Sequence, residues 1–160
     1  MVQDSFYTLR TRTLEGKETN LNSFAGQVTL VVNVASECGF TPQYKGLEAL
    51  HAQFQGRGFS VLGFPSNDFG GQEPGTPEEI RSFCSTKYKV SFPLFEKVVT
   101  KAGPGQSPIY AHLQAQAKSL PDWNFCKYLV GKDGRVLKFF RSKLKPDDAG
   151  LRKEIEDALR

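Results

Sequence analysis

One cysteine stands where an apolar run gives way to a predicted helix. In the stretch VVNVASECGFTP, residues 31–42, Cys38 follows the run, and Gly39 and the pair Thr41-Pro42 come directly after it. Backbone amides and the macrodipole at a helix N-terminus stabilise an anion, so we expect the thiolate form of Cys38 to be favoured. A buried, inert thiol is the alternative, because free cysteines are among the most buried residues. Position alone does not separate the two interpretations.

Three other side chains carry N–H donors that suit a thiolate. Gln72 lies in the Gly-rich loop NDFGGQEPG, and Trp123, the only tryptophan, precedes Asn124 at the start of a predicted hairpin. An amide or indole N–H directed at sulfur would stabilise its charge, and would also stabilise an oxygen that leaves as an anion. Taken singly, Trp123 is explained by packing and the two amides by turn structure. Their combination with Cys38 is what predicts a site.

The elements that must position these residues alternate between strand and helix. Strands are predicted at 27–36, 59–65 and 91–99, helices at 41–58, 76–88, 107–119 and 147–160, and hairpins within the first 25 residues and over 124–140. A Thr-Pro or Ser-Pro pair is expected to start three of the helices, at Thr41, Thr76 and Ser107. This order predicts an α/β sandwich with partly parallel strands, made mixed by the C-terminal hairpin. Sheets of this type hold their sites beyond the carboxyl ends of the strands, where Cys38 lies.

Composition narrows the class of protein. The 160 residues are 39% hydrophobic and 24% charged, which is typical of a soluble globular chain, and we predict a single domain over residues 1–160. No apolar run reaches the length of a membrane span, and the N-terminus lacks the pattern of a secretory signal. Three cysteines cannot all pair within the chain, and two histidines without ligand spacing predict no metal and no cofactor. Free thiols suit the cytoplasm, with the periplasm or an organelle left open.

The positive charge is uneven along the chain. The formal net charge is +4, and residues 127–145 hold seven basic residues against one acid, Asp133. The basic residues are Lys127, Lys132, Arg135, Lys138, Arg141, Lys143 and Lys145. Such a run is most simply a solvated face, and the alternative is a surface that attracts an anionic substrate or a lipid headgroup. Nucleic acid is not expected, because no helix concentrates the charge and no recognition motif is present.

Four stretches, NVASECGFTPQY, GFPSNDFGGQEPGTPEEI, FCSTKYKVSFPLF and WNFCKYLV, together resemble the glutathione peroxidase family in order and spacing, from about Phe6 to the C-terminus. The resemblance implies a thioredoxin-like three-layer α/β/α sandwich with a mixed central sheet, and reduction of hydrogen peroxide or organic and lipid hydroperoxides. It implies that Cys38 is the thiol that attacks the peroxide. It also implies that Gln72, Trp123 and Asn124 complete the catalytic group.

Cys84 is similar in position to the resolving cysteine of the thioredoxin-dependent members. The resemblance implies that Cys84 attacks a Cys38 sulfenic acid, and that thioredoxin opens the resulting disulfide. We expect the two sulfurs to be beyond bonding distance in the reduced protein, and the helix from Thr76 to Tyr88 to loosen on oxidation. Glutathione acting on Cys38 alone, or a peroxide sensor or relay that oxidises a partner protein, are the alternatives. Cys126 is interpreted as a packing residue.

The stretch between Cys84 and Trp123 is short. Tetrameric members of the family carry a longer insertion there, so the resemblance implies a monomer with an open site that admits bulky hydroperoxides. The basic residues from Lys138 to Lys145 are then expected to make a weak contact with an anionic membrane surface.

Overall fold

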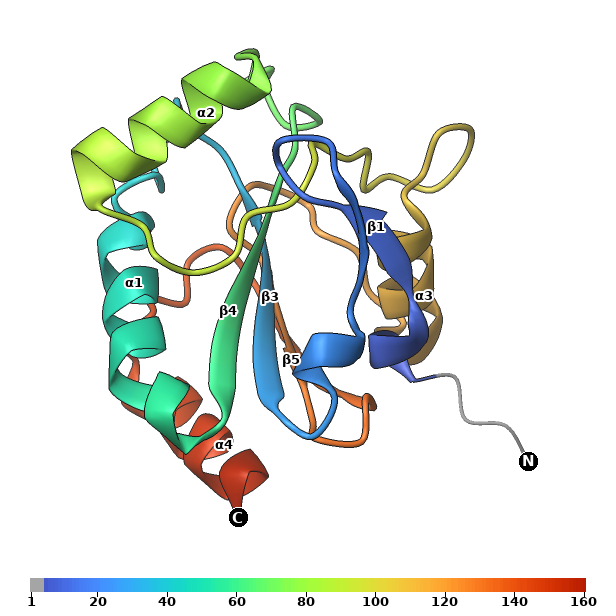
Figure 1. Cartoon of the computed structure of the whole chain (residues 1–160), viewed down its shortest axis with the longest axis vertical. Helices are drawn as coiled ribbons and strands as arrows, with labels where there is room; N and C mark the ends of the chain where they lie inside the picture. The colour runs from blue at the N-terminus through green and yellow to red at the C-terminus, as the bar shows by residue number, and fades with distance from the viewer. Residues whose placement is uncertain (1–4) are drawn as a thin grey trace.

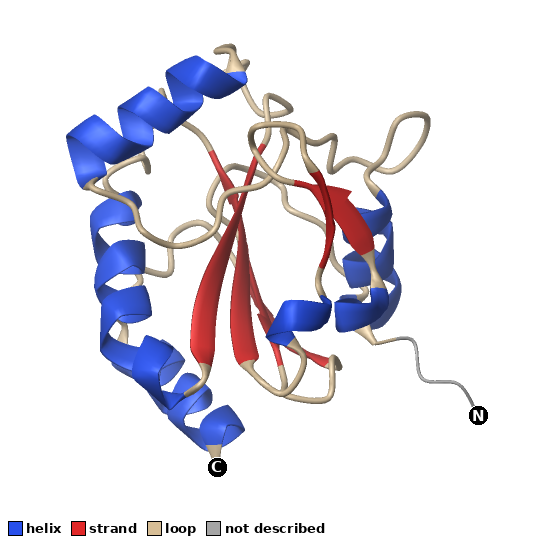
Figure 2. Ribbon diagram, viewed as in Figure 1, coloured by secondary structure: helices blue, strands red, loops and turns tan. Residues whose placement is uncertain are grey.

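A four-stranded mixed sheet forms the middle layer of the protein, as Figures 1 and 2 show. The computed structural model describes residues 5–160. The strands in spatial order are β4 (Phe59–Pro65), β3 (Val28–Val34), β5 (Lys127–Val130) and β6 (Val136–Phe140). β3 and β4 are parallel, whereas β5 is antiparallel to both β3 and β6. The predicted mixed sheet and C-terminal hairpin are confirmed.

Helices cover both faces of this sheet (Figure 1). The helices are α1 (Gln43–Phe54), α2 (Pro77–Phe83), α3 (Pro108–Ala117) and α4 (Ala149–Leu159), with 3₁₀ turns at Phe6–Thr8, Asn22–Phe24 and Gln55–Arg57. α1 and α4 lie on one face and α3 lies on the other, which confirms the three-layer α/β/α arrangement. The predicted N-terminal hairpin forms from β1 (Arg10–Arg12) and β2 (Glu18–Asn20). None of the helices described between residues 5 and 160 is long and apolar enough to span a bilayer.

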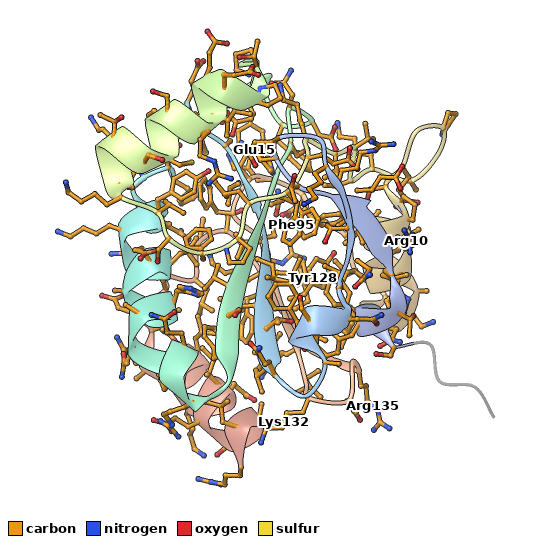
Figure 3. All side chains as sticks on the ribbon, viewed as in Figure 1. Arg10, Glu15, Phe95, Tyr128, Lys132 and Arg135 are labelled. Carbon is orange, nitrogen blue, oxygen red and sulfur yellow. The ribbon has the colours of Figure 1, made fainter. Side chains whose placement is uncertain are left out.

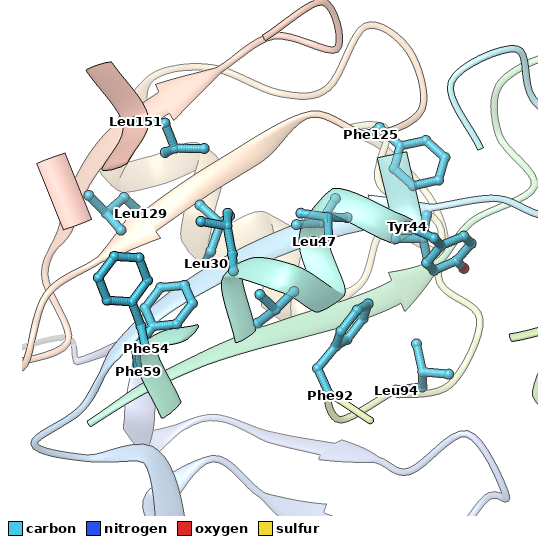
Figure 4. Packing of buried hydrophobic residues seen from close by; sticks show 14 of the residues in the cluster. Leu30, Tyr44, Leu47, Phe54, Phe59, Phe92, Leu94, Phe125, Leu129 and Leu151 are labelled. Carbon is cyan, nitrogen blue, oxygen red and sulfur yellow. The ribbon is translucent and has the colours of Figure 1, made fainter. Parts of the chain in front are cut away.

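Alternate residues of β3 enter two separate cores, because successive side chains of a strand point to opposite faces. Leu30 belongs to the same core as Leu47 of α1 and Leu151 of α4, and Figure 4 shows the three side chains between strand and helices. Val31 belongs to the second core, with Tyr128, which Figure 3 labels. Because every residue of β3 is buried, this strand is the fixed support from which the Cys38 segment extends.

The prediction of a strand over 91–99 is wrong. This segment lies beside β4 but forms only isolated bridges, one of them between Gly63 and Leu94. Gly63 N–H donates to Pro93 O (3.0 Å), and Phe95 N–H donates to Gly63 O (2.9 Å). The ladder is interrupted because Pro93 and Pro65 have no N–H to donate, and one further contact follows, in which Val98 N–H donates to Pro65 O (2.8 Å). The approach is so close that a Cβ on Gly63 would lie 2.8 Å from Leu94 Cδ2.

His51 closes the same edge of the sheet from α1. Its side chain is 5% exposed, and its Nδ1 accepts a hydrogen bond from Val61 N–H of β4 (3.2 Å). An accepting Nδ1 requires the neutral ring, and burial lowers the pKa of His51 below its usual 6.5. His51 is therefore more than a packing residue, because its ring satisfies a backbone donor of the edge strand.

The lowered pKa of His51 predicts that the folded protein is less stable in acid. The unfolded chain binds a proton at His51 near pH 6.5 and the folded chain binds it only at lower pH. The contribution of His51 is therefore complete above pH 6.5 and is lost as the pH falls from there through the lowered pKa. Urea unfolding between pH 7.5 and 5 should show a weaker pH dependence for His51→Gln than for the wild type. Equal slopes for the two proteins would contradict the assignment.

Candidate active site

Cys38 lies in a tight loop between β3 and α1. Its side chain is 7% exposed, and its Sγ accepts a hydrogen bond from Phe40 N–H (3.3 Å). Thr41 fixes the loop, because its hydroxyl accepts from Cys38 N–H (2.9 Å) and donates to Ala35 O (2.8 Å). The expectation that Thr41 starts the helix is thus wrong: α1 begins at Gln43 without a side-chain cap. The amide that reaches the sulfur comes from the loop and not from the helix N-terminus.

The Gln72 loop packs against the Cys38 loop. Glu37 N–H donates to Gln72 O (3.0 Å), which joins the ends of β3 and β4 through one backbone contact. Gly70 and Gly71 have φ values of +69° and +61°, a conformation that side chains rarely adopt. A Cβ on Gly70 would lie 3.1 Å from the Trp123 ring. The two glycines therefore let the loop fold back between Cys38 and Trp123.

Asn124 joins this pair from the segment before β5. Its Nδ2 donates to Gln72 Oε1 (2.9 Å) and lies 3.4 Å from Phe69 O, so its amide hydrogens are directed at the Gln72 loop. Its Oδ1 is buried without a partner. The structure brings the three predicted segments together, but among residues 5–160 no side-chain donor of Gln72, Trp123 or Asn124 is bonded to the Cys38 sulfur.

Trp123 forms one wall of this region. The ring is partly buried, and its centroid lies 6.0 Å from that of Phe69 at an interplanar angle of 52°. The indole N–H has no hydrogen-bond acceptor in the part of the chain that the structure describes, so it is available to an oxygen atom bound beside it.

Asn33 of β3 is the residue that sequence reasoning missed here. Its Nδ2 donates to Trp123 O (2.9 Å), its Oδ1 accepts from Cys126 N–H (3.0 Å), and its backbone O accepts from Phe125 N–H (2.6 Å). Phe125 is buried at φ +66°, so the chain reverses sharply at this point. Ser142 adds a fourth contact, because its Oγ donates to Asn124 O (2.6 Å). The signal was present as the single polar side chain in the apolar run VVNVA.

Cys84 occupies a different environment from Cys38. It is fully buried where α2 ends and a π-helical turn (Cys84–Tyr88) begins. The helix start predicted at Thr76 is confirmed, and Thr76 and Glu79 form a capping box there. The thiol lies within interaction range of the Tyr44 hydroxyl, which forms no well-aligned hydrogen bond. Burial raises the pKa of Cys84. All three cysteines are free, so Cys84 is held as a protonated thiol in the apolar interior.

Cys126 is buried beside polar atoms of its own neighbourhood. Its Sγ lies 3.6 Å from Asp122 Oδ1 and 3.5 Å from Ser142 Oγ. These contacts agree with the interpretation of Cys126 as a packing residue. No cluster of His, Cys, Asp and Glu that would hold a metal ion occurs among the described residues.

The basic run does not form the continuous surface that its sequence suggested. Lys127 is fully buried, where its Nζ donates to Gln43 Oε1 and to Leu144 O (both 2.7 Å), and burial lowers its pKa to about 8. Arg135, Lys138 and Arg141 face acidic partners, which are Asp133, Glu154 and Asp122.

Lys143 and Lys145 are exposed and form no ion pair within residues 5–160. With Lys45 they line a groove of about 500 Å³ that begins at Gly39, the residue after Cys38.

Comparisons with known proteins agree with this geometry. A family model described as glutathione peroxidase matches residues 6–114. The chain is 46% identical to hydroperoxy fatty acid reductase gpx1 of Synechocystis sp., over 98% of this chain and 96% of that protein. It is 41% identical to thioredoxin/glutathione peroxidase BtuE of Escherichia coli, over 99% of each.

The chain is also similar to proteins of known structure. The crystal structure of Trgpx in apo form matches with a TM-score of 0.80 and 32% identity, over 98% of this chain and 97% of that one. A thioredoxin family protein from Chlorobium tepidum matches with a TM-score of 0.72 and 14% identity, over 95% and 93% of the two chains. The second match concerns the fold alone, and it shows that the sandwich is thioredoxin-like.

The Asn33 contacts predict a large effect of one truncation. Asn33→Ala leaves Cys126 N–H and Trp123 O buried without partners, and should lower the free energy of unfolding by about 2–4 kcal/mol. Ser142→Ala removes one contact to the same loop and should cost about 1 kcal/mol. Urea unfolding measures both, and a red shift of Trp123 fluorescence in folded Asn33→Ala would report the released loop. Equal small losses in the two variants would show that Asn33 does not hold it.

Proposed function

The chain belongs to the glutathione peroxidase family, and we propose that Cys38 is the thiol with which it attacks peroxides. The protein is a thiol peroxidase that reduces hydroperoxides to water or alcohols. One observation supports the role of Cys38 above the others. The hydrogen bonds from Glu37 to Gln72 and from Asn124 to Gln72 bring the Gln72 loop and the segment before β5 to the loop of this cysteine, whereas Cys84 is enclosed in the apolar interior and the Cys126 sulfur contacts Asp122 and Ser142.

In the first step the Cys38 sulfur attacks the terminal oxygen of the hydroperoxide. The S–O bond forms, the O–O bond breaks, and the sulfur loses the two electrons that the peroxide gains. The leaving oxygen takes the proton released by the thiol and departs as water or an alcohol. Trp123 and Asn124 are positioned beside this region, and we assign their N–H groups, with that of Gln72, to the leaving oxygen. The hydrogen bond between the two side chains uses the Gln72 carbonyl, so only Asn124 must release an acceptor, either Gln72 Oε1 or Phe69 O, to donate to it.

In the second step Cys84 resolves the sulfenic acid. Its sulfur attacks Cys38, the S–S bond forms, the S–O bond breaks, and hydroxide leaves as water. We propose thioredoxin as the reductant that opens this disulfide, and E. coli BtuE, which is named a thioredoxin/glutathione peroxidase, supports the choice. Because Cys84 is fully buried, the step requires the end of α2 to open.

The groove beside Cys38 suits a bulky hydroperoxide. We propose that organic and lipid hydroperoxides enter there, which the name of the Synechocystis relative, hydroperoxy fatty acid reductase, supports. We also propose that the protein acts as a monomer, because the stretch between Cys84 and Trp123 is short. Lys143 and Lys145 at the rim then provide a weak contact with an anionic membrane surface. Binding to anionic vesicles should weaken as salt is added, and salt-insensitive binding would contradict the contact. The free thiols of the cycle favour the cytoplasm, with the periplasm or an organelle as alternatives.

Cysteine variants test the two-step cycle. Cys38→Ser should abolish peroxide reduction, and Cys84→Ser should consume one equivalent of hydroperoxide and then stop with thioredoxin as the only reductant. Cys126→Ser, a change at an equally buried cysteine, should turn over at close to the wild-type rate. A non-reducing peptide map after one equivalent of hydroperoxide should show the Cys38–Cys84 disulfide. A Cys38 sulfenic or sulfinic acid with Cys84 free would instead indicate glutathione as the reductant or a sensor.

Oxidation should loosen the segment that carries Cys84. The π-helical turn after α2 ends in Lys89 at φ +52°, and this segment must move for Cys84 to leave the interior. Hydrogen exchange of the amides in residues 77–88 should accelerate at least tenfold in the disulfide form, whereas those of α3 should keep their protection. Equal protection of residues 77–88 in the two redox forms would contradict the opening.

A further inference from the structure

Glu73 is a buried carboxylate that the peroxide step does not use. Its side chain is 0% exposed, its Oε1 accepts from Ser36 N–H (3.1 Å), and its backbone N–H donates to Asn67 Oδ1 (2.8 Å). Its Oε2 is buried without a hydrogen-bond partner. A buried carboxylate oxygen without a hydrogen bond destabilises the folded protein by about several kcal/mol, so its presence indicates a role other than stability.

Glu73 lies between the Cys38 loop and α2, the helix that leads to Cys84. It lines a cavity of about 360 Å³ together with Ser36 and Glu37 of the Cys38 loop and with Ile80 and Phe83 of α2. Phe83 directly precedes Cys84, so the cavity adjoins the segment that must move toward Cys38. Glu73 interacts electrostatically with the Cys84 thiol, and both interact with the Tyr44 hydroxyl.

Among the carboxylates that line this cavity, Glu73 is the one placed to act as a base. Glu37 on the Cys38 loop raises its pKa, Lys97 on the 91–99 segment lowers it, and burial, the largest effect, raises it. Arg81 of α2 acts on Cys84 from the other side. Glu37 is exposed, and Glu79 is committed to the capping box of α2, which leaves Glu73 as the buried carboxylate of the cavity.

We propose that Glu73 accepts the proton of the Cys84 thiol as Cys84 attacks the Cys38 sulfenic acid. The inference rests on the proposed role of Cys84 as the resolving cysteine. The carboxylate takes the thiol proton, the S–S bond forms, and the S–O bond of Cys38 breaks. The carboxylic acid then returns the proton to the departing hydroxide, which leaves as water. The step needs no further reactant, because its net change is thiol and sulfenic acid to disulfide and water.

A buried thiol explains why such a base is needed. The nucleophile is the thiolate, and burial makes the Cys84 thiolate rare at neutral pH. A carboxylate whose own pKa is raised is better matched to a thiol than an exposed one, which increases its efficiency as a base. The hydrogen bond to Ser36 N–H fixes one oxygen and leaves the unpartnered one for the proton.

The experiment separates resolution from peroxide attack. The full-length protein is mixed with excess hydrogen peroxide, quenched with an alkylating reagent at set times, and the Cys38–Cys84 disulfide is quantified by mass at pH 6, 7 and 8. Glu73→Gln keeps the shape and the acceptor for Ser36 N–H but removes the base. Glu37→Gln is the matched control, an identical change in the same cavity at an exposed side chain.

We expect wild type and Glu37→Gln to form the disulfide at rates that vary less than twofold between pH 6 and 8. Glu73→Gln should resolve about 100-fold more slowly at pH 7, with a rate that rises about tenfold per pH unit as the free thiolate forms, while peroxide consumption in the first turnover is unchanged.

A wild-type resolution rate that itself rises tenfold per pH unit would overturn the proposal without any variant. A Glu73→Gln protein with the rate and pH profile of the wild type would overturn it and leave the resolving role of Cys84 intact. Absence of the disulfide in the wild type would overturn both.

Discussion

The geometry of the site depends on one amide side chain placed inside an apolar strand. The chain reverses at Phe125, whose backbone is in the left-handed conformation, so a sheet ladder cannot supply the hydrogen bonds there. The Asn33 side chain supplies them instead, to Trp123 O and from Cys126 N–H. A polar residue in a buried strand is costly unless its hydrogen bonds are satisfied, and here both the carbonyl and the amide of the side chain are used. β3 thus positions Cys38 at its end and Trp123 and Asn124 at its side, so the parts of the site share a single rigid support.

The same fold keeps the thiols of Cys38 and Cys84, for which we propose the two redox roles, in opposite environments. Cys38 lies at the surface end of β3 with a loop amide directed at its sulfur, whereas Cys84 is enclosed by Tyr44, Phe83 and other aromatic rings. In the proposed cycle a single conformation cannot serve both steps, since the first requires a firmly held Cys38 sulfur and the second requires Cys84 to leave its pocket. The π-helical turn at Cys84 places an irregular part of the helix at the residue that moves in the proposed cycle.

Much of this arrangement could be read from the sequence, for physical reasons that differ between elements. The buried strands β3 and β4 and the helix opened by Thr76 carry strong local signals, apolar β-branched runs and a capping box, so they were predicted correctly. The segment 91–99 has the same apolar composition, but two prolines on facing chains prevent a ladder. Thr41-Pro42 resembles a helix start, yet the hydroxyl serves the Cys38 loop. Glu73 gave no signal, because its burial arises only when two loops distant in sequence pack together.

The closed edge of β4 has a consequence for how copies of this protein meet. An open strand edge presents unpaired amides and carbonyls to any neighbour, and this is the route by which sheets from separate chains join into aggregates. His51 and the backbone of the 91–98 segment occupy those groups on β4. The opposite edge, β6, carries Lys138 at its centre, and a charged side chain on an edge strand discourages pairing with a second chain. The irregular chain beside β4 therefore protects a concentrated solution of this protein against strand exchange.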